Sequence, residues 1–217
     1  MSIENQKTLE IYKEKANVYM SNNQRHELLN PEMEYQKRNY VRNLIKKNFS
    51  EIPENAKVFE IGSANGENSK YIKSLGYDIT ASDTVKPFLR CLQNEGLKYI
   101  KFNALTDEFI ESYFAIFCWR VFVHFTKEDA LKVIKKVYNN LEKNGIFIFN
   151  ALNWDLKRID NEWLDYEGEY HIGSERFFNY FKREDLEEMI KQLNFQIKYF
   201  DYQGDDNKWM VYVLKKR

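Results

Sequence analysis

Short, continuous apolar runs alternate with helical stretches from residue 57 onward, and this alternation constrains the fold more than any other feature. The runs KVFEIG, YDITASD, LKYIKFNA, YFAIFCWRVFV and IFIFNAL are typical of strands. Strands that are apolar on both faces belong to a mostly parallel sheet with helices on either side. The alternation therefore predicts a doubly wound α/β fold.

The stretches between these runs carry helix signals. ENSKYIKSLG and KPFLRCLQNEG are examples, and TKEDALKVIKKVYNNLEKNG is expected to begin after Thr126 as N-cap and to end at Gly145. After a last helix, KREDLEEMIKQLNF, the alternating segments QIKYFDYQ and KWMVYVLKK are joined by GDDN and predict an antiparallel hairpin. The sheet is therefore predicted to have seven strands and to be mostly parallel, with this hairpin at its C-terminal end.

Two helical segments precede the first strand. IENQKTLEIYKEKANVYM and, after Pro31, MEYQKRNYVRNLIKKNF place apolar side chains at helical spacing. We therefore expect an N-terminal helical lid over residues 1–50 and an α/β domain over residues 51–217. A polar and aromatic stretch at about residues 153–180 has no clear periodicity and is expected to be an insertion in that domain.

Composition limits the classes of partner. The chain has 217 residues with 33 basic and 33 acidic side chains, so it lacks the basic excess of a typical nucleic-acid-binding domain. Its two cysteines have no metal-ligand spacing, and its apolar runs are far shorter than the roughly 20 residues that span a bilayer. We expect a soluble, cytoplasmic monomer or homodimer without a metal, a membrane anchor or a nucleic-acid partner.

Glycines and an acid stand where the first two strands end. Gly62 and Gly66 follow the first strand, and Asp83 ends the second. Ligands of open α/β sheets bind beyond these carboxyl ends, where glycine allows close backbone approach and a carboxylate can accept two hydrogen bonds from a ribose diol. The alternative is that each position is an ordinary turn residue, and their order and spacing together favour a nucleoside-binding site.

The segment VFEIGSANGENS resembles the first motif of the class I S-adenosylmethionine-dependent methyltransferases of small-molecule type. In that motif an apolar strand is followed by acid-x-Gly-x-x-x-Gly, whereas the dinucleotide fingerprint G-x-G-x-x-G would need glycine at Ala64. YDITASD, IKFNAL, FAIFCWRVFVHF and LEKNGIFIFNAL resemble the later strand ends of the family, so the resemblance covers about residues 57–152. It implies a Rossmann-like methyltransferase domain.

The resemblance also implies S-adenosyl-L-methionine as cofactor, with S-adenosyl-L-homocysteine as product. Glu60 would hold the amino group of the methionine part, and Asp83 would accept from the ribose hydroxyls. The other implied cofactor contacts are Gly62, Ser63, Ala64 and Gly66 in the loop, Thr84, Asn103 and Ala104 along the adenine, and Cys118 and Trp119 beside the methionine part.

Two positions depart from the family pattern. Asn103 stands where an acid is frequent, although its amide can both accept from and donate to adenine. Phe114 is followed by Ala115 where an aromatic-acid pair is common. These departures concern individual contacts more than the family itself.

The first helix carries Tyr12 and Tyr19 in the segment IYKEKANVYM. This resembles the tyrosine-containing lead-in that many small-molecule members use to cover the cofactor, and an aromatic wall suits a cationic sulfonium. The alternative is a tyrosine stripe that packs the helix on the sheet.

Candidates for a general base and for the acceptor pocket lie later in the chain. His124 directly follows a strand end, where a loop-capping role is the alternative, and His171 lies in the insertion. The insertion also carries Trp154, Tyr166, Tyr170 and Arg176, which we expect to line the acceptor pocket because long ordered loops are often functional. A solvated excursion is the alternative.

The sequence thus predicts a methyltransferase that acts on a hydroxyl, or next on an amine, of a small molecule such as a sugar or other metabolite. The basic segment KRNYVRNLIKK keeps an RNA or protein methyltransferase as the second hypothesis, although the same segment is typical of a solvated helix face. A cofactor-binding module without catalysis is the third, because a fold alone does not establish chemistry.

Overall fold

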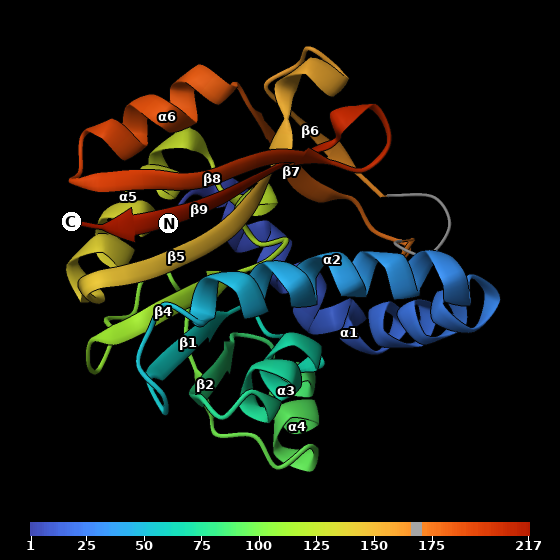
Figure 1. Cartoon of the computed structure of the whole chain (residues 1–217). Coiled ribbons are helices and arrows are strands. Elements are labelled where there is room, and N and C mark those ends of the chain that lie inside the picture. The colour runs from blue at the N-terminus through green and yellow to red at the C-terminus, as the bar shows by residue number, and fades with distance from the viewer. Residues whose placement is uncertain (166–170) are drawn as a thin grey trace.

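The computed structural model describes residues 1–165 and 171–217 and contains one mixed sheet (Figure 1). Within this part of the chain the sheet has nine strands, and its order is β3-β2-β1-β4-β5, continued by β9 and β8 and, at the far end of β5, by β7 and β6. The strands are β1 Lys57–Ile61, β2 Asp78–Asp83, β3 Tyr99–Lys101, β4 Tyr113–Cys118, β5 Leu141–Asn153, β6 Asn161–Leu164, β7 Arg176–Phe181, β8 Phe195–Gln203 and β9 Trp209–Lys216.

The first five strands are parallel, and the C-terminal hairpin is antiparallel. β9 lies antiparallel along β5, from Ile146 opposite Lys215 to Leu152 opposite Trp209, and β8 forms the edge beyond it. The predicted doubly wound α/β fold with a C-terminal antiparallel hairpin is therefore confirmed. Two strands beyond the predicted seven, β6 and β7, come from the insertion.

Helices cover both faces of the sheet (Figure 1). α5 (Lys127–Asn140) and α6 (Arg183–Lys191) pack on one apolar cluster, whereas α2 (Pro31–Phe49) and α3 (Glu67–Ser74) pack on another. Neighbouring residues of one strand join opposite clusters: Phe117 of β4 faces α2 and α3, and Cys118 faces α5 and α6. Burial on both faces explains why the strand runs are continuously apolar instead of alternating.

The remaining helices lie near the carboxyl ends of the strands. α4 (Lys86–Asn94) follows β2, and α1 (Ile3–Leu29) packs on it through Ala16 and Phe88. Short 3₁₀ helices are η1 (Phe122–His124), η2 (Trp154–Leu156) and η4 (Asp205–Asn207). In the described residues no helix is both long and apolar enough to cross a membrane.

The expected end of α5 at Gly145 is wrong. Thr126 caps the helix as predicted, its hydroxyl accepting from the N–H of Asp129 at 3.2 Å, but the helix ends at Asn140. Leu141 is already extended, and the pairing of β4 with β5 skips from Leu141 to Ile146 across a bulge. A Cβ on Gly145 would lie 2.8 Å from the carbonyl oxygen of Glu142 and 3.2 Å from that of Phe114, so close backbone packing accounts for this glycine.

The insertion is partly built into the core. β7 pairs with the end of β5 and with β6, and all six of its residues are buried. A solvated excursion is therefore wrong for β7, whereas β6 is only partly buried. Tyr166 and Tyr170 lie outside the described residues.

The two predicted N-terminal helices are confirmed, and Pro31 occupies the first turn of α2 as expected. α1 lies along β7, where the backbone N–H of Phe177 donates to the Thr8 hydroxyl at 3.0 Å. Beyond this contact α1 and α2 run together past the end of the sheet (Figure 1). A separate lid over residues 1–50 stays a prediction.

Candidate functional site

A cavity of about 820 Å³ opens at the carboxyl ends of the central strands. The loop after β1 and the segments that follow β2, β3 and β4 form its floor, and side chains of α1 and α2 form its cover. Its wall includes many predicted site residues, namely Tyr12, Tyr19, Gly62, Ser63, Ala64, Asp83, Thr84, Asn103, Ala104, Trp119 and His124. The structure thus brings most of the implied cofactor positions to one cavity.

The loop after β1 needs glycine at both predicted positions. Gly62 and Gly66 have φ values of 70° and 77°, in the left-handed region that L side chains rarely adopt. A Cβ on Gly62 would lie 2.5 Å from Cγ2 of Val121, and one on Gly66 would lie 2.7 Å from Cδ1 of Leu97. Both conformation and space therefore disfavour a larger residue at these two positions, as the spacing suggested.

Asp83 is tied to this loop by main-chain donors. One carboxylate oxygen accepts from the N–H of Ala64 at 3.1 Å and the other from the N–H of Val85 at 2.9 Å. Asp83 is only 7% exposed, and burial raises its pKa to about 6 although these backbone donors oppose the shift. The side chain therefore titrates near neutrality while it faces the cavity.

Glu60 occupies a different place from the one implied. It is 1% exposed and is not in the cavity wall; its carboxylate accepts from the Asn68 amide at 3.2 Å and from the Ser69 hydroxyl. Burial raises its pKa, against the effect of these hydrogen bonds. In this conformation Glu60 holds the first turn of α3 beneath the glycine loop.

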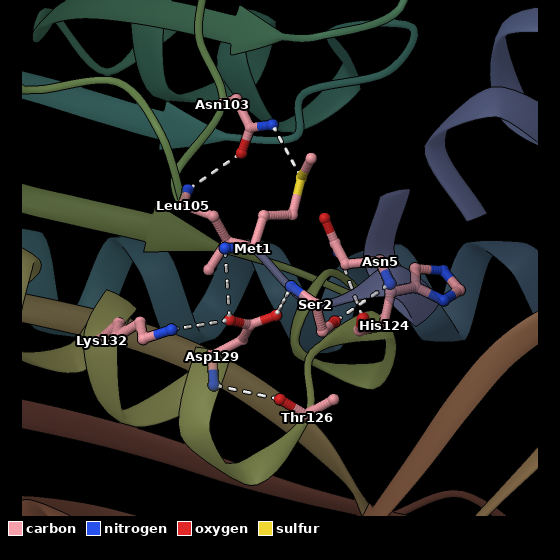
Figure 2. Close-up of polar contacts among 9 residues, drawn as sticks. All are labelled: Met1, Ser2, Asn5, Asn103, Leu105, His124, Thr126, Asp129 and Lys132. Atoms are coloured by element: carbon pink, nitrogen blue, oxygen red, sulfur yellow. Dashed lines mark hydrogen bonds and ion pairs between the residues drawn. The ribbon is translucent and has the colours of Figure 1, made fainter. Parts of the chain in front are cut away.

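The implied adenine positions follow β3. Asn103 lines the cavity, but its side-chain oxygen already accepts from the N–H of Leu105 at 2.9 Å, in a turn that fixes the loop (Figure 2). Its amide nitrogen lies 3.5 Å from the sulfur of Met1 (Figure 2). Ala104, which is buried, and Thr84 complete this part of the wall.

Cys118 and Trp119 are adjacent in sequence but differ in position. Cys118 is fully buried, outside the cavity wall, and burial raises the pKa of its thiol. Trp119 lines the cavity and stacks on Phe117 with ring centroids 5.7 Å apart. Of the two, only Trp119 faces the space where a ligand would bind.

Tyr12 and Tyr19 lie together in the cavity cover. Their ring centroids are 5.7 Å apart, and Tyr19 lies 5.8 Å from Phe88 of α4. They therefore pack the helix on the domain, as the alternative expected, and also line the cavity. Burial raises the pKa of Tyr12 to about 12, so its hydroxyl stays protonated.

Both ring nitrogens of His124 are engaged. Nδ1 lies 2.7 Å from the carbonyl oxygen of Phe177, which can only accept, and Nε2 lies 3.1 Å from the Tyr12 hydroxyl. The Nδ1–H tautomer follows from the first contact, so Nε2 accepts from Tyr12. Burial lowers the pKa of His124 to about 4, and Asn5 donates to its backbone carbonyl at 3.2 Å (Figure 2).

Of the other residues predicted for the acceptor pocket or as base, the three in the described part of the chain lie off the cavity wall, namely His171, Trp154 and Arg176. The His171 side chain is 61% exposed and lies 3.0 Å from the Asp165 carboxylate. The indole N–H of Trp154 donates to Asp160 at 3.1 Å, on the surface. Arg176 is buried and donates to the Tyr12 hydroxyl at 3.0 Å. These placements reflect local polar partners that the sequence does not reveal.

The structure instead brings other residues to the cavity wall, among them Glu34, Arg120, Asn150 and Trp209. The N–H of Arg120, at a φ of 58°, donates to the Asn150 side chain at 2.6 Å, and the guanidinium lies 5.8 Å from the Trp209 ring centroid. Sequence reasoning missed them because they come from segments far apart in the chain. Polar residues directly after β4 and near the end of β5 were the available signal.

The Glu34 carboxylate lies among basic side chains. It accepts from the Lys37 ammonium at 2.8 Å and lies 3.4 Å from Nδ1 of His26. Burial acts to raise the pKa of Glu34, but the Lys37 hydrogen bond and the neighbouring positive charges lower it. In the described residues no cluster of three or more His, Cys, Asp or Glu side chains forms a metal site.

A family model described as a methyltransferase domain matches residues 33–199. A search of curated proteins finds no significant match.

Three solved structures are similar in fold. An S-adenosylmethionine-dependent methyltransferase from Clostridium acetobutylicum ATCC 824 has a TM-score of 0.68 at 15% identity, over 94% of this chain and 98% of that chain. A protein from Pyrococcus horikoshii OT3 has a TM-score of 0.68 at 16% identity, over 83% and 91%. Magnesium protoporphyrin IX methyltransferase from Synechocystis PCC 6803, solved with bound S-adenosylmethionine, has a TM-score of 0.64 at 13% identity, over 84% and 79%.

The loop geometry generates a stability prediction. Gly62→Ala is expected to lower the free energy of unfolding by about 2 kcal/mol, because the new Cβ is strained by its positive φ and meets Val121. Ala64→Gly, two residues away at a φ of 45°, is the matched control and is expected to leave stability unchanged or slightly higher. Urea denaturation measures both variants. Equal stability of Gly62→Ala and the parent would contradict the assigned conformation.

Proposed function

The chain belongs to the class I S-adenosylmethionine-dependent methyltransferases, and we propose that it methylates a hydroxyl, or alternatively an amine, of a small molecule such as a sugar or other metabolite. The observation that carries this proposal is the cavity of about 820 Å³, whose wall includes the glycine loop and Asp83 together with further aromatic and polar side chains such as Trp119, Arg120 and Trp209. Its volume lies within the roughly 300–1,000 Å³ of typical small-molecule sites.

The residues present fit the cofactor. When bound, S-adenosylmethionine supplies a methyl group that its sulfonium has already activated. The glycine loop would lie beneath the methionine part, and the Asp83 carboxylate, held by the N–H groups of Ala64 and Val85, would accept from the ribose hydroxyls. Thr84, Asn103 and Ala104 would lie along the adenine. Glu60 would act from below the loop through its contacts to α3.

The cover from α1 would exclude water and complement a cation. Tyr12 and Tyr19 present aromatic rings to the cavity, and the electron-rich face of such a ring attracts a positive charge. Water exclusion strengthens this attraction because charges interact more strongly away from bulk solvent. Trp119 would extend the aromatic wall toward the acceptor end.

His124 and His171 are the two candidates for a general base. His124 lies in the cavity wall, but with a pKa near 4 and a hydrogen bond from Tyr12 it holds a proton poorly at neutral pH. Its geometry favours orienting Tyr12 over accepting a proton from the acceptor. His171 would reach the acceptor only if its side chain left the surface.

Access to the cavity supports a small acceptor over a macromolecule. α1 and α2 lie across the acceptor end, where Glu34, Arg120 and Trp209 meet, so an acceptor must fit under two helices. The RNA or protein alternative rests on the basic face of α2, where the Arg38 guanidinium is already ion-paired with Glu27 and Glu67. A binding module without catalysis is the other alternative.

Transfer of a labelled methyl group tests the acceptor class. The protein is incubated with labelled S-adenosylmethionine and, in parallel, with a low-molecular-weight metabolite fraction, total RNA and total protein. We expect label in the metabolite fraction. Label confined to RNA or protein would refute the small-molecule proposal, and cofactor binding without transfer to any fraction would favour the binding module.

The pKa of Asp83 generates a prediction for cofactor binding. An ionised carboxylate accepts two hydrogen bonds from a diol, and a protonated one does not, so affinity should fall as the pH drops through about 6. The Kd for S-adenosylhomocysteine is expected to rise about tenfold between pH 8 and pH 5. Isothermal titration calorimetry measures this dependence. Asp83→Asn serves as control and should bind weakly with little pH dependence. If its Kd instead varied with pH as that of the parent does, Asp83 would not contact the ribose.

The two histidines should behave differently when replaced. His171→Ala is expected to leave turnover unchanged because the side chain is exposed and off the cavity. His124→Ala is expected to lower turnover and cofactor affinity because Tyr12 loses its acceptor. Initial rates with the methylated fraction, together with calorimetry, measure both effects. A large loss of turnover in His171→Ala with cofactor binding intact would instead identify it as the base.

A further inference from the structure

A closed set of polar contacts links three segments that are far apart in the chain: α1, η1 and β7. The Tyr12 hydroxyl of α1 donates to Nε2 of His124 at 3.1 Å and accepts from Nη1 of Arg176 at 3.0 Å. The same stretch of β7 reaches α1 and η1 through the backbone of Phe177, whose N–H donates to Thr8 and whose carbonyl accepts from His124. α1 and β7 are thus joined by several neighbouring hydrogen bonds.

Arg176 is the unusual member of this set. It is 2% exposed, and its guanidinium lies between two aromatic rings, 5.4 Å from the centroid of Tyr12 and 5.5 Å from that of Phe178. Its Nη2 lies 4.0 Å from the Asp165 carboxylate. Burying a guanidinium costs free energy that a packed apolar side chain would not cost. Packing alone therefore does not account for an arginine at this position.

The hydrogen bond from Arg176 ends on a residue of the cavity. Tyr12 lies in the cavity wall next to Tyr19, whereas Arg176 lies behind it and does not line the cavity. The two hydrogen bonds at the phenolic oxygen fix the position of the Tyr12 hydroxyl. The Arg176 guanidinium, 5.4 Å from the ring centroid, packs on the ring face and restricts its rotation. Tyr12 is the residue through which Arg176 would influence a bound ligand.

We propose that Arg176 is a positioning residue that presents the Tyr12 ring to the bound cofactor, so that β7 completes the cofactor cover. This inference rests on the proposed function, since it needs S-adenosylmethionine in the cavity. It gives β7 a role at the cofactor end. It also differs from direct contact between Arg176 and the acceptor, because the Tyr12 phenol stands between the guanidinium and the cavity.

A double-mutant cycle on the full chain tests this inference, with the Kd for S-adenosylhomocysteine as the readout. Tyr12→Phe and Arg176→Met should each weaken binding about tenfold, as expected for one lost charge-assisted hydrogen bond at the site. If Arg176 acts through the Tyr12 hydroxyl, the double variant should bind within about twofold of the weaker single variant. Arg176→Lys keeps a donor and should recover most of the affinity. Arg90→Met is the matched control at an exposed position on α4 and should bind like the parent.

Each outcome decides a separate point. Two results would overturn the positioning role: losses of binding free energy that add in the double variant, or parent-like binding by Arg176→Met. Thermal denaturation establishes that each variant is folded. If Arg176→Met is not, the cycle is run with Arg176→Lys, whose remaining loss of affinity should disappear in the Tyr12→Phe background. Failure of the parent protein to bind S-adenosylhomocysteine would refute the cofactor assignment, and this inference with it. Binding by the parent together with additive losses would refute the inference alone.

Discussion

The carboxyl ends of β1 and β2 are fastened to each other, and the whole candidate site depends on this connection. The Ser63 N–H donates to the Ser82 carbonyl at 2.7 Å, and the Ser63 hydroxyl accepts from the Ser82 N–H at 3.0 Å. One residue further along, the Ala64 N–H donates to Asp83. These bonds hold the loop in a left-handed conformation that is costly for Ala64. The carboxylate that faces the cavity therefore also maintains its floor.

The cavity cover depends on a second, longer-range connection. Side chains from the first half of α1 contact η1 and β7 one after another: Asn5 the His124 carbonyl, Thr8 the Phe177 N–H, and Tyr12 both His124 and Arg176. Their spacing along the chain, three to four residues, is that of one helix face, so a single face of α1 carries all of them. Opening of this cover would require these buried contacts to break together.

The sequence predicts the parts of this protein that follow from local pattern and leaves out those that need tertiary contacts. The strands were predictable because a strand buried on both faces is continuously apolar. Gly62, Gly66 and Asp83 were predictable because each stands where a strand ends and a βα turn begins. The end of α5 was not, because a bulge opposite β4 determines it. The placement of Arg176 was not either, since its partner Tyr12 lies 164 residues away. His171 and Trp154 likewise have surface partners that the sequence does not reveal.

The same distinction explains why the sequence identifies the cofactor better than the acceptor. The floor at the cofactor end comes from consecutive βα turns, whose order is fixed by the fold and visible as a motif series. The proposed acceptor end combines Glu34 of α2, Arg120 after β4 and Trp209 of the C-terminal hairpin, which share no local pattern. On this proposal, acceptor identity depends on side chains that only the folded structure brings together, whereas the site for the cofactor is encoded in the fold.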